Sequence, residues 1–415
     1  MADWDGLRRG LEGAIDPPPL NALRDRRRRR QQRRTIAVTC ALVLVGTAAG
    51  VAVLGEHSPE RVREQAISPL ILGDRFTPPR GDHGYVVTDV DFVTASTGWA
   101  IGMRCQGETC TAATWRSDDG GTTWGDEVVV ARDVPRASYT GQDPAGGAVR
   151  SLRMVDANEG FAFNPDLYVT HDGARTWLRV PQPSKVAGVS VQGRSVWVTE
   201  RGCPADEDCD VVLRAGTIGP AFALAPLRVP ATRGATIVRR SDAAHGYLVA
   251  FDDPTAPGTL HRTGNGGVTW TKGANPCPAA RSVALSSRTT LLAICSGEVV
   301  AYDEKTHRVP KQAFASTDGQ AWHRLADPPA EGELTDLTAA SATTAYATTQ
   351  QPARLLVTTD GGTTWLPAPG TALTGYGYLN LDVVDAAHVW AMGDQGVLWR
   401  TTDGTIWHRL ALPAS

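Results

Sequence analysis

One eight-residue string recurs along the chain and restricts the folds that the chain can adopt. Ser117–Trp124 has the sequence SDDGGTTW, and close copies begin at Thr170, Thr263 and Thr358. Shorter copies, STDGQAW and TTDGTIW, begin at Ser316 and Thr401. In the copies that contain Asp, its carboxylate can accept backbone N–H groups of a turn. Gly supplies a positive φ, and Thr-Trp opens the next strand. The string therefore predicts a strand–turn–strand unit and an architectural role.

Each of the six copies contains residues that we expect to be structural. They are Ser117, Asp119, Gly121, Thr123, Trp124, Asp172, Trp177, Asn265, Trp270, Asp318, Trp322, Asp360, Gly362, Trp365, Asp403 and Trp407.

The spacing of the closing Trp counts the repeats. Successive Trp residues are separated by 53, 93, 52, 43 and 42 positions. The interval of 93 contains a further unit, in which residues 185–216 supply three strands and Phe222 stands in place of Trp. An alternating apolar run, a polar turn and an aromatic strand precede each copy. Seven units of four strands, each about 40–60 residues long, are typical of propeller blades. The sequence therefore predicts an all-β, seven-bladed β-propeller preceded by one N-terminal transmembrane helix.

The membrane prediction rests on Thr35–Leu54, twenty residues without a charge, which is the length of a bilayer-spanning helix. An Arg-rich segment precedes it, so the positive-inside rule places residues 1–34 in the cytoplasm. We expect a stalk over residues 55–84 and the propeller over residues 85–415, on the extracytoplasmic side of the cell membrane. A cleaved signal peptide is the alternative, although the 34-residue leader is long for one.

The charge distribution argues against nucleic acid as a partner. Residues 1–34 hold ten Arg and five Asp or Glu, so the rest of the chain has 31 of the 41 basic and 39 of the 44 acidic residues. The body is therefore acidic, whereas nucleic-acid-binding domains are basic.

Six cysteines lie beyond the apolar segment, and an even number fits an oxidising compartment. Proximity in the chain pairs Cys105 with Cys110 and Cys203 with Cys209, which leaves Cys277 and Cys295 to pair. No CxxC spacing or His cluster accompanies them, so we expect no metal, and no motif for a cofactor is present.

The repeated string resembles the Asp-box, or bacterial neuraminidase repeat. The aromatic strand before it is similar to that of the seven-bladed propellers related to photosystem II assembly and stability factors. The resemblance covers about residues 85–412 and implies a propeller. Asn265 departs from the pattern at the Asp position, and Ala174 departs at the Gly position.

Sialidases carry the same repeat, so the resemblance also implies a test for catalysis. Their first arginine lies in a Phe/Tyr-Arg-Ile-Pro motif, which is absent here; the nearest strings are LRVP at 178–181 and 227–230. Acidic groups such as Asp252-Asp253 suit solvated loops, since charged residues are mostly exposed. We therefore expect a binding protein rather than an enzyme. A glycoside hydrolase of the exo-sialidase kind is the alternative.

The expected topology indicates where a ligand binds. In an up-and-down blade the Asp-containing turns share one face, and the longer, irregular connections emerge on the other. Loops on a rigid scaffold often carry binding residues. We therefore predict a site for a protein, peptide or glycan on the face opposite the Asp turns. Its candidate residues are Arg136, Tyr139, Tyr302, Lys305, His307, Arg308, Tyr376 and Tyr378.

Overall fold

The computed structural model describes residues 84–107, 109–135, 149–201, 211–230, 236–250, 258–277, 282–287, 290–297, 300–302, 307–350, 352–368, 379–393 and 397–413. The chain divides into two compact units, Met1–Ser58 and Pro59–Ser415, and every described residue belongs to the second. The predicted tail, the predicted membrane span and the stalk up to residue 83 lie outside the described residues. Within the described part, no helix is long and apolar enough to cross a bilayer.

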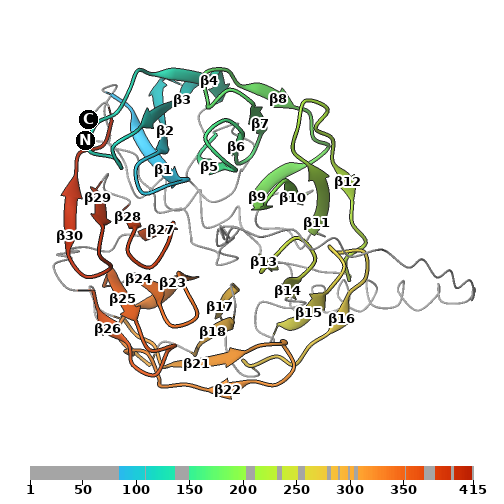
Figure 1. Cartoon of the computed structure of the whole chain (residues 1–415), viewed down its shortest axis with the longest axis vertical. Helices are drawn as coiled ribbons and strands as arrows, with labels where there is room; N and C mark the ends of the chain where they lie inside the picture. Colours follow the sequence, from blue (N-terminus) through green and yellow to red (C-terminus); the bar gives the residue numbers. More distant parts are fainter. Residues whose placement is uncertain are drawn as a thin grey trace, which may run out of the picture. The chain divides into compact units, whose positions relative to one another are not determined.

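The second unit is a seven-bladed β-propeller, and each blade is a four-stranded antiparallel sheet (Figure 1). Blade 1 contains β1 (Val86–Phe92), β2 (Gly98–Gln106), β3 (Thr109–Ser117) and β4 (Val128–Pro135); blade 2 contains β5 (Ser151–Met154), β6 (Gly160–Phe163), β7 (Leu167–Thr170) and β8 (Leu178–Val180). Blade 3 contains β9 (Lys185–Gln192), β10 (Ser195–Arg201), β11 (Val211–Thr217) and β12 (Ala225–Pro226); blade 4 contains β13 (Thr236–Arg240), β14 (Gly246–Ala250), β15 (Thr259–Thr263) and β16 (Thr271–Lys272).

Blade 5 contains β17 (Ser282–Ser287), β18 (Leu291–Ser296), β21 (Lys311–Ser316) and β22 (His323–Arg324). Blade 6 contains β23 (Glu333–Ala339), β24 (Ala345–Gln350), β25 (Arg354–Thr358) and β26 (Leu366–Pro367); blade 7 contains β27 (Leu379–Val383), β28 (Val389–Gly393), β29 (Val397–Thr401) and β30 (Trp407–Leu410). A separate hairpin, β19 (Ala301–Tyr302) and β20 (His307–Arg308), is inserted between β18 and β21.

The ring closes without strand exchange. Each blade is one contiguous segment, its first strand lies nearest the centre, and β27 of the last blade contacts β1 of the first (Figure 1). At this closing seam the rings of Phe92 and Trp390 stack with centroids 3.9 Å apart. The backbone N–H of Phe92 also donates to Asp382 Oδ2 at 2.5 Å. Side chains and backbone therefore join the two ends of the ring.

The hydrophobic core lies between the blades. Each of seven clusters of buried side chains combines residues of two neighbouring blades, and together they account for all seven seams. The hidden unit in the 93-residue interval is confirmed as blade 3. Its Phe222 packs against Phe161 of blade 2 with ring centroids 5.1 Å apart. Phe222 therefore occupies the role that Trp has in the other blades.

The recurring string forms the turn between the third and fourth strands of six blades. In blade 1, Asp119 Oδ1 accepts the N–H groups of Thr122 and Thr123 at 2.9 Å, and Oδ2 accepts the Thr123 hydroxyl at 2.6 Å. The Gly121 N–H donates to Ser117 Oγ at 2.8 Å. Gly121 has φ of 91°, and Ala174 takes the equivalent left-handed position with φ of 69°. The side chains of Ser117 and Asp119 thus accept backbone N–H groups of the turn.

Candidate functional site

A repeated backbone contact holds the connections on one face of the propeller. On the face of the Asp turns, the turn glycine of five blades donates its N–H to a carbonyl of the turn between the first two strands. In blade 1, for example, Gly120 donates to Ser96 at 2.7 Å; the other pairs are Gly173 with Asn158, Gly266 with Ala244, Gly361 with Thr343 and Gly404 with Ala387. This face, the turn face, is therefore occupied by repeated structural contacts.

The opposite face, the loop face, carries the blade-5 hairpin of β19 and β20. The hairpin leaves the blade after the paired residues Ser296 and Lys311 and lies outside the four-stranded ladder. In it Tyr302 pairs with His307, and Ala301 pairs with Arg308. Three predicted binding residues, Tyr302, His307 and Arg308, are thus brought together on one inserted element.

The outer strand of this hairpin is joined to the connection between blades 5 and 6. Arg308 forms a β-bridge with Glu331, and the N–H of Val309 donates to the Ala330 carbonyl at 2.7 Å. The Arg308 side chain itself is exposed. The Glu331 carboxylate also contacts Arg354 Nη2 at 3.0 Å. Two segments of the loop face therefore form a single surface.

Lys311 lies beneath this surface and is only 2% exposed. Its Nζ donates to the carbonyl oxygens of Gly332 at 2.6 Å and Pro329 at 3.0 Å. It also donates to those of Glu331 at 3.2 Å and Val309 at 3.3 Å. Burial lowers the pKa of Lys311 to about 8, and the Glu331 and Glu333 carboxylates oppose that shift. The ammonium joins the foot of the hairpin to the neighbouring connection.

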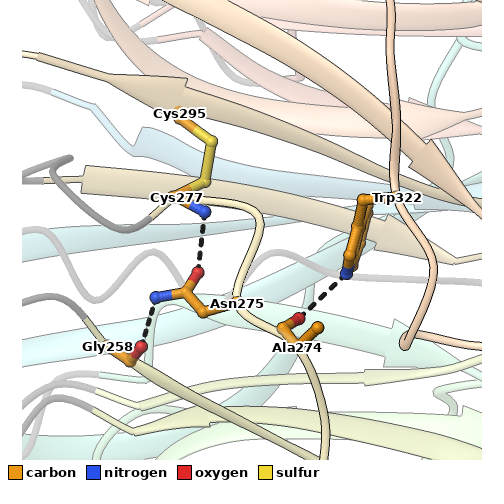
Figure 2. Close-up of a disulfide and its surroundings, with 6 residues drawn as sticks. All are labelled: Gly258, Ala274, Asn275, Cys277, Cys295 and Trp322. Atoms are coloured by element: carbon orange, nitrogen blue, oxygen red, sulfur yellow. Dashed lines mark hydrogen bonds between the residues drawn. A yellow bond between two sulfur atoms is a disulfide. The ribbon is translucent and has the colours of Figure 1, made fainter.

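A disulfide holds the other side of the hairpin base. Cys277, which follows β16, is bonded to Cys295 near the end of β18 (Figure 2). The Asn275 side chain accepts the N–H of Cys277 at 2.9 Å and donates to the Gly258 carbonyl (Figure 2). Trp322 Nε1 donates to the Ala274 carbonyl at 2.9 Å. The connection from blade 4 is therefore tied to the strand that leads into the hairpin.

The predicted disulfide between Cys105 and Cys110 is also present, but its setting differs from the expectation. We predicted longer, irregular connections on this face, whereas here β2 and β3 extend through both cysteines, which face each other in register. Cross-strand pairing continues as far as Gln106 and Thr109, next to the tip of the hairpin. Cys203 and Cys209 lie outside the described residues, as do Arg136, Tyr139, Lys305, Tyr376 and Tyr378.

Buried charges cluster on the innermost strands, away from the loop-face hairpin. Asp89 Oδ2 accepts the Leu152 N–H at 2.9 Å, and Asp91 Oδ1 accepts Arg153 Nη1 at 2.9 Å. Desolvation raises the pKa of Asp89 to about 7. These carboxylates bond to the backbone and side chains of the next blade, so they join blades to one another. Among the described residues, no group of three or more His, Cys, Asp or Glu could hold a metal ion.

Sequence reasoning missed Lys311, Glu331 and Arg354 as parts of this surface. A lysine at the start of a strand is normally solvated, and nothing in its neighbours in the sequence indicates a cage of carbonyls. The two cysteines at positions 277 and 295 were the one signal that marked the base of the hairpin in advance.

Comparison with known proteins places the fold but no family. No protein-family description and no curated protein matches the sequence. Among solved structures, the chain is similar to YCF48 bound to D1 peptide, with a TM-score of 0.52 and 15% identity over 85% of this chain and 99% of that one. It is also similar to YCF48 from Cyanidioschyzon merolae, with a TM-score of 0.48 and 15% identity over 82% and 98%. For puromycin hydrolase the TM-score is 0.53, with 13% identity over 86% of this chain and 57% of that one. At these identities, the two similarities with TM-scores above 0.5 show the propeller fold alone.

Proposed function

We propose that this protein is a binding or scaffold propeller that holds a protein or peptide partner on its loop face, centred on the blade-5 hairpin. The observation that carries the proposal is the way this hairpin is built. It is an insertion outside the blade ladder, and a disulfide, a buried lysine and a β-bridge all fix its base. Preorganised loops on a rigid scaffold reduce the ordering cost of binding.

Two further observations support a polypeptide partner. Val300, at the foot of the hairpin, exposes 62% of its surface and lies beside the exposed Arg308, so apolar and charged contacts are available together. A solved structure with a similar fold, YCF48, is bound to D1 peptide. The turn face has the opposite character, since its repeated turns are engaged with one another.

We further propose that the propeller is anchored to the cell membrane by residues 35–54 and stands on the extracytoplasmic side. The uncharged segment and the arginines before it support this proposal, as do the two disulfides in the propeller. We also propose that the recurring turns are Asp-boxes. The hydrogen bonds between the Asp side chain and the Ser or Thr side chains of the turn support this identification.

Site-specific photo-crosslinking of the full-length protein in its own cells tests the binding proposal. A photoreactive amino acid replaces Val300 or Arg308 on the loop face; in the control it replaces Thr317, an exposed residue on the turn face of the same blade. We expect a discrete adduct with a polypeptide from the two loop-face positions only. Equal adducts from both faces, or none from the loop face, would contradict the proposal. Turnover of glycosides by residues 85–415 would favour the hydrolase alternative instead.

A further inference from the structure

We infer that the carbonyl oxygens of Val309, Pro329, Glu331 and Gly332 form a cation site that the Lys311 ammonium fills, and that this occupancy positions the binding surface of the blade-5 hairpin. Lys311 is therefore a positioning residue. The inference rests on the proposed function for its biological meaning, but the cation site itself can be tested without a partner.

Four carbonyl oxygens converge on one nitrogen atom. All four oxygens lie within 3.3 Å of one Nζ atom, and an ammonium has three N–H donors to share among them. Carbonyl oxygens brought this close repel one another unless a positive charge lies between them. A buried charge, in turn, is tolerated only when it is paired or hydrogen-bonded. The lysine and the cage therefore require each other.

The connection between blades 5 and 6 has little freedom to form the cage in another way. Gly332 has φ of 75°, and a Cβ there would lie 2.7 Å from Thr349 Oγ1 and 2.9 Å from the Gln350 carbonyl. Next to it, Ala330 and Glu331 are held to Val309 and Arg308 of the hairpin by backbone pairing. The connection is thus held between blade 6 and the hairpin, with Lys311 below.

The two carboxylates near the cage have partners of their own. The Glu331 carboxylate is paired with Arg354, and the Glu333 carboxylate accepts the Gln350 side chain at 2.8 Å. Because these carboxylates have their own partners, the carbonyls are the groups that directly contact the ammonium. A neutral side chain of the same length would leave all four carbonyls without the ammonium donor.

Amide hydrogen exchange of the propeller tests the cation site. In Lys311→Met, we expect protection of segments 307–310 and 326–333 to fall by about tenfold or more, since hydrogen bonds to a charged group are lost. Protection of blade 2 should not change. In Lys311→Ala, added ethylammonium should restore protection of the two segments, whereas ethanol at the same concentration should not. If the Ala variant does not fold unaided, the folded yield with and without ethylammonium gives the same comparison.

Unchanged protection in Lys311→Met, or equal rescue by ethanol and ethylammonium, would overturn the cation site. The link to function is measured separately, through the Val300 photo-crosslink in Lys311→Met. If protection falls and the crosslink decreases, the cage positions the binding surface. If protection falls but the wild-type protein gives no loop-face crosslink, the proposed function fails while the cation site stands.

Discussion

Trp390 Nε1 donates a hydrogen bond of 3.0 Å to the Gly120 carbonyl, across 270 positions of the chain. The same contact occurs at the seam between blades 1 and 2, where Trp99 Nε1 donates to the Gly173 carbonyl at 3.1 Å. In each case an aromatic residue of the second strand of one blade reaches the Asp turn of the next. The closing seam therefore uses the contacts that join blades elsewhere in the ring.

Substitution of these two tryptophans tests whether the closing seam is equivalent to an internal one. Trp390→Phe and Trp99→Phe each remove an indole N–H and leave a buried carbonyl without that donor. We expect each to lower the free energy of unfolding by about 1–3 kcal/mol, and by similar amounts. Urea unfolding followed by fluorescence measures both. A much larger loss of stability for Trp390→Phe than for Trp99→Phe would show that the closing seam is not equivalent to an internal one.

The left-handed position in the Asp turn gives a second prediction. In Gly121→Ala the new Cβ would lie 3.2 Å from Leu410 Cδ1 and 3.3 Å from Phe92 Cζ, at a φ that L residues disfavour. We expect a loss of about 1–2 kcal/mol from the backbone alone. Ala174→Gly is the reverse change, and there relief of strain is offset by the loss of a buried methyl group. Its stability should change by less than about 1 kcal/mol. Equal effects of the two changes in thermal unfolding would contradict this account.

The carboxylate of the turn gives a third prediction, because blade 4 has Asn265 in its place. Asn265 Oδ1 accepts the Thr269 N–H at 2.9 Å, and its Nδ2 donates to the Thr269 hydroxyl at 2.9 Å. Asp119→Asn should therefore keep the turn at pH 7, whereas Asp119→Ala should lower stability by about 1 kcal/mol. Thermal unfolding of the two variants beside the wild type measures the difference; equal losses would show that the side-chain bonds do not matter.

Acid pH should bring the stabilities of Asp119→Asn and the wild type closer together. Hydrogen bonds from Thr123 lower the pKa of Asp119 to about 2, below its ordinary 3.8. A lowered carboxyl pKa stabilises the fold above pH 3.8, and that contribution is lost as the pH falls towards 2. The wild type should therefore lose its advantage over Asp119→Asn between these pH values, as measured by urea unfolding at pH 5 and pH 2.5. A difference that stays constant would contradict the assignment.

Asp89 should change the pH dependence of stability in the opposite direction. Burial raises its pKa to about 7, so the native state retains a proton that the unfolded chain has already released above pH 3.8. By linkage its contribution to stability decreases as the pH rises from about 4 to about 7. In Asp89→Asn this pH dependence should disappear, although the variant loses one of two backbone hydrogen bonds. Parallel stability curves for wild type and variant over this range would rule out the raised pKa.

The fold could be predicted from the sequence because its repeated residues are fixed by local backbone needs. Asp119, Gly121 and Trp124 act within a few residues of one another, so the string survives in recognisable form and even an eroded unit, with Phe222, can be counted. The site depends on contacts between separate segments. The cage at Lys311 needs residues 329–332 folded against residues 309–311, and no local pattern records that arrangement. The pairing of Cys105 with Cys110 could be predicted, since cysteines five positions apart suit a hairpin, but how far β2 and β3 extend could not.

The most direct test of the account is the photo-crosslink from residue 308 compared with residue 317, in the same full-length protein and on the two faces of one blade. The account predicts a discrete polypeptide adduct from residue 308 and none from residue 317. Adducts from residue 317 alone, or from both positions equally, would contradict the assignment of the loop face as the binding surface.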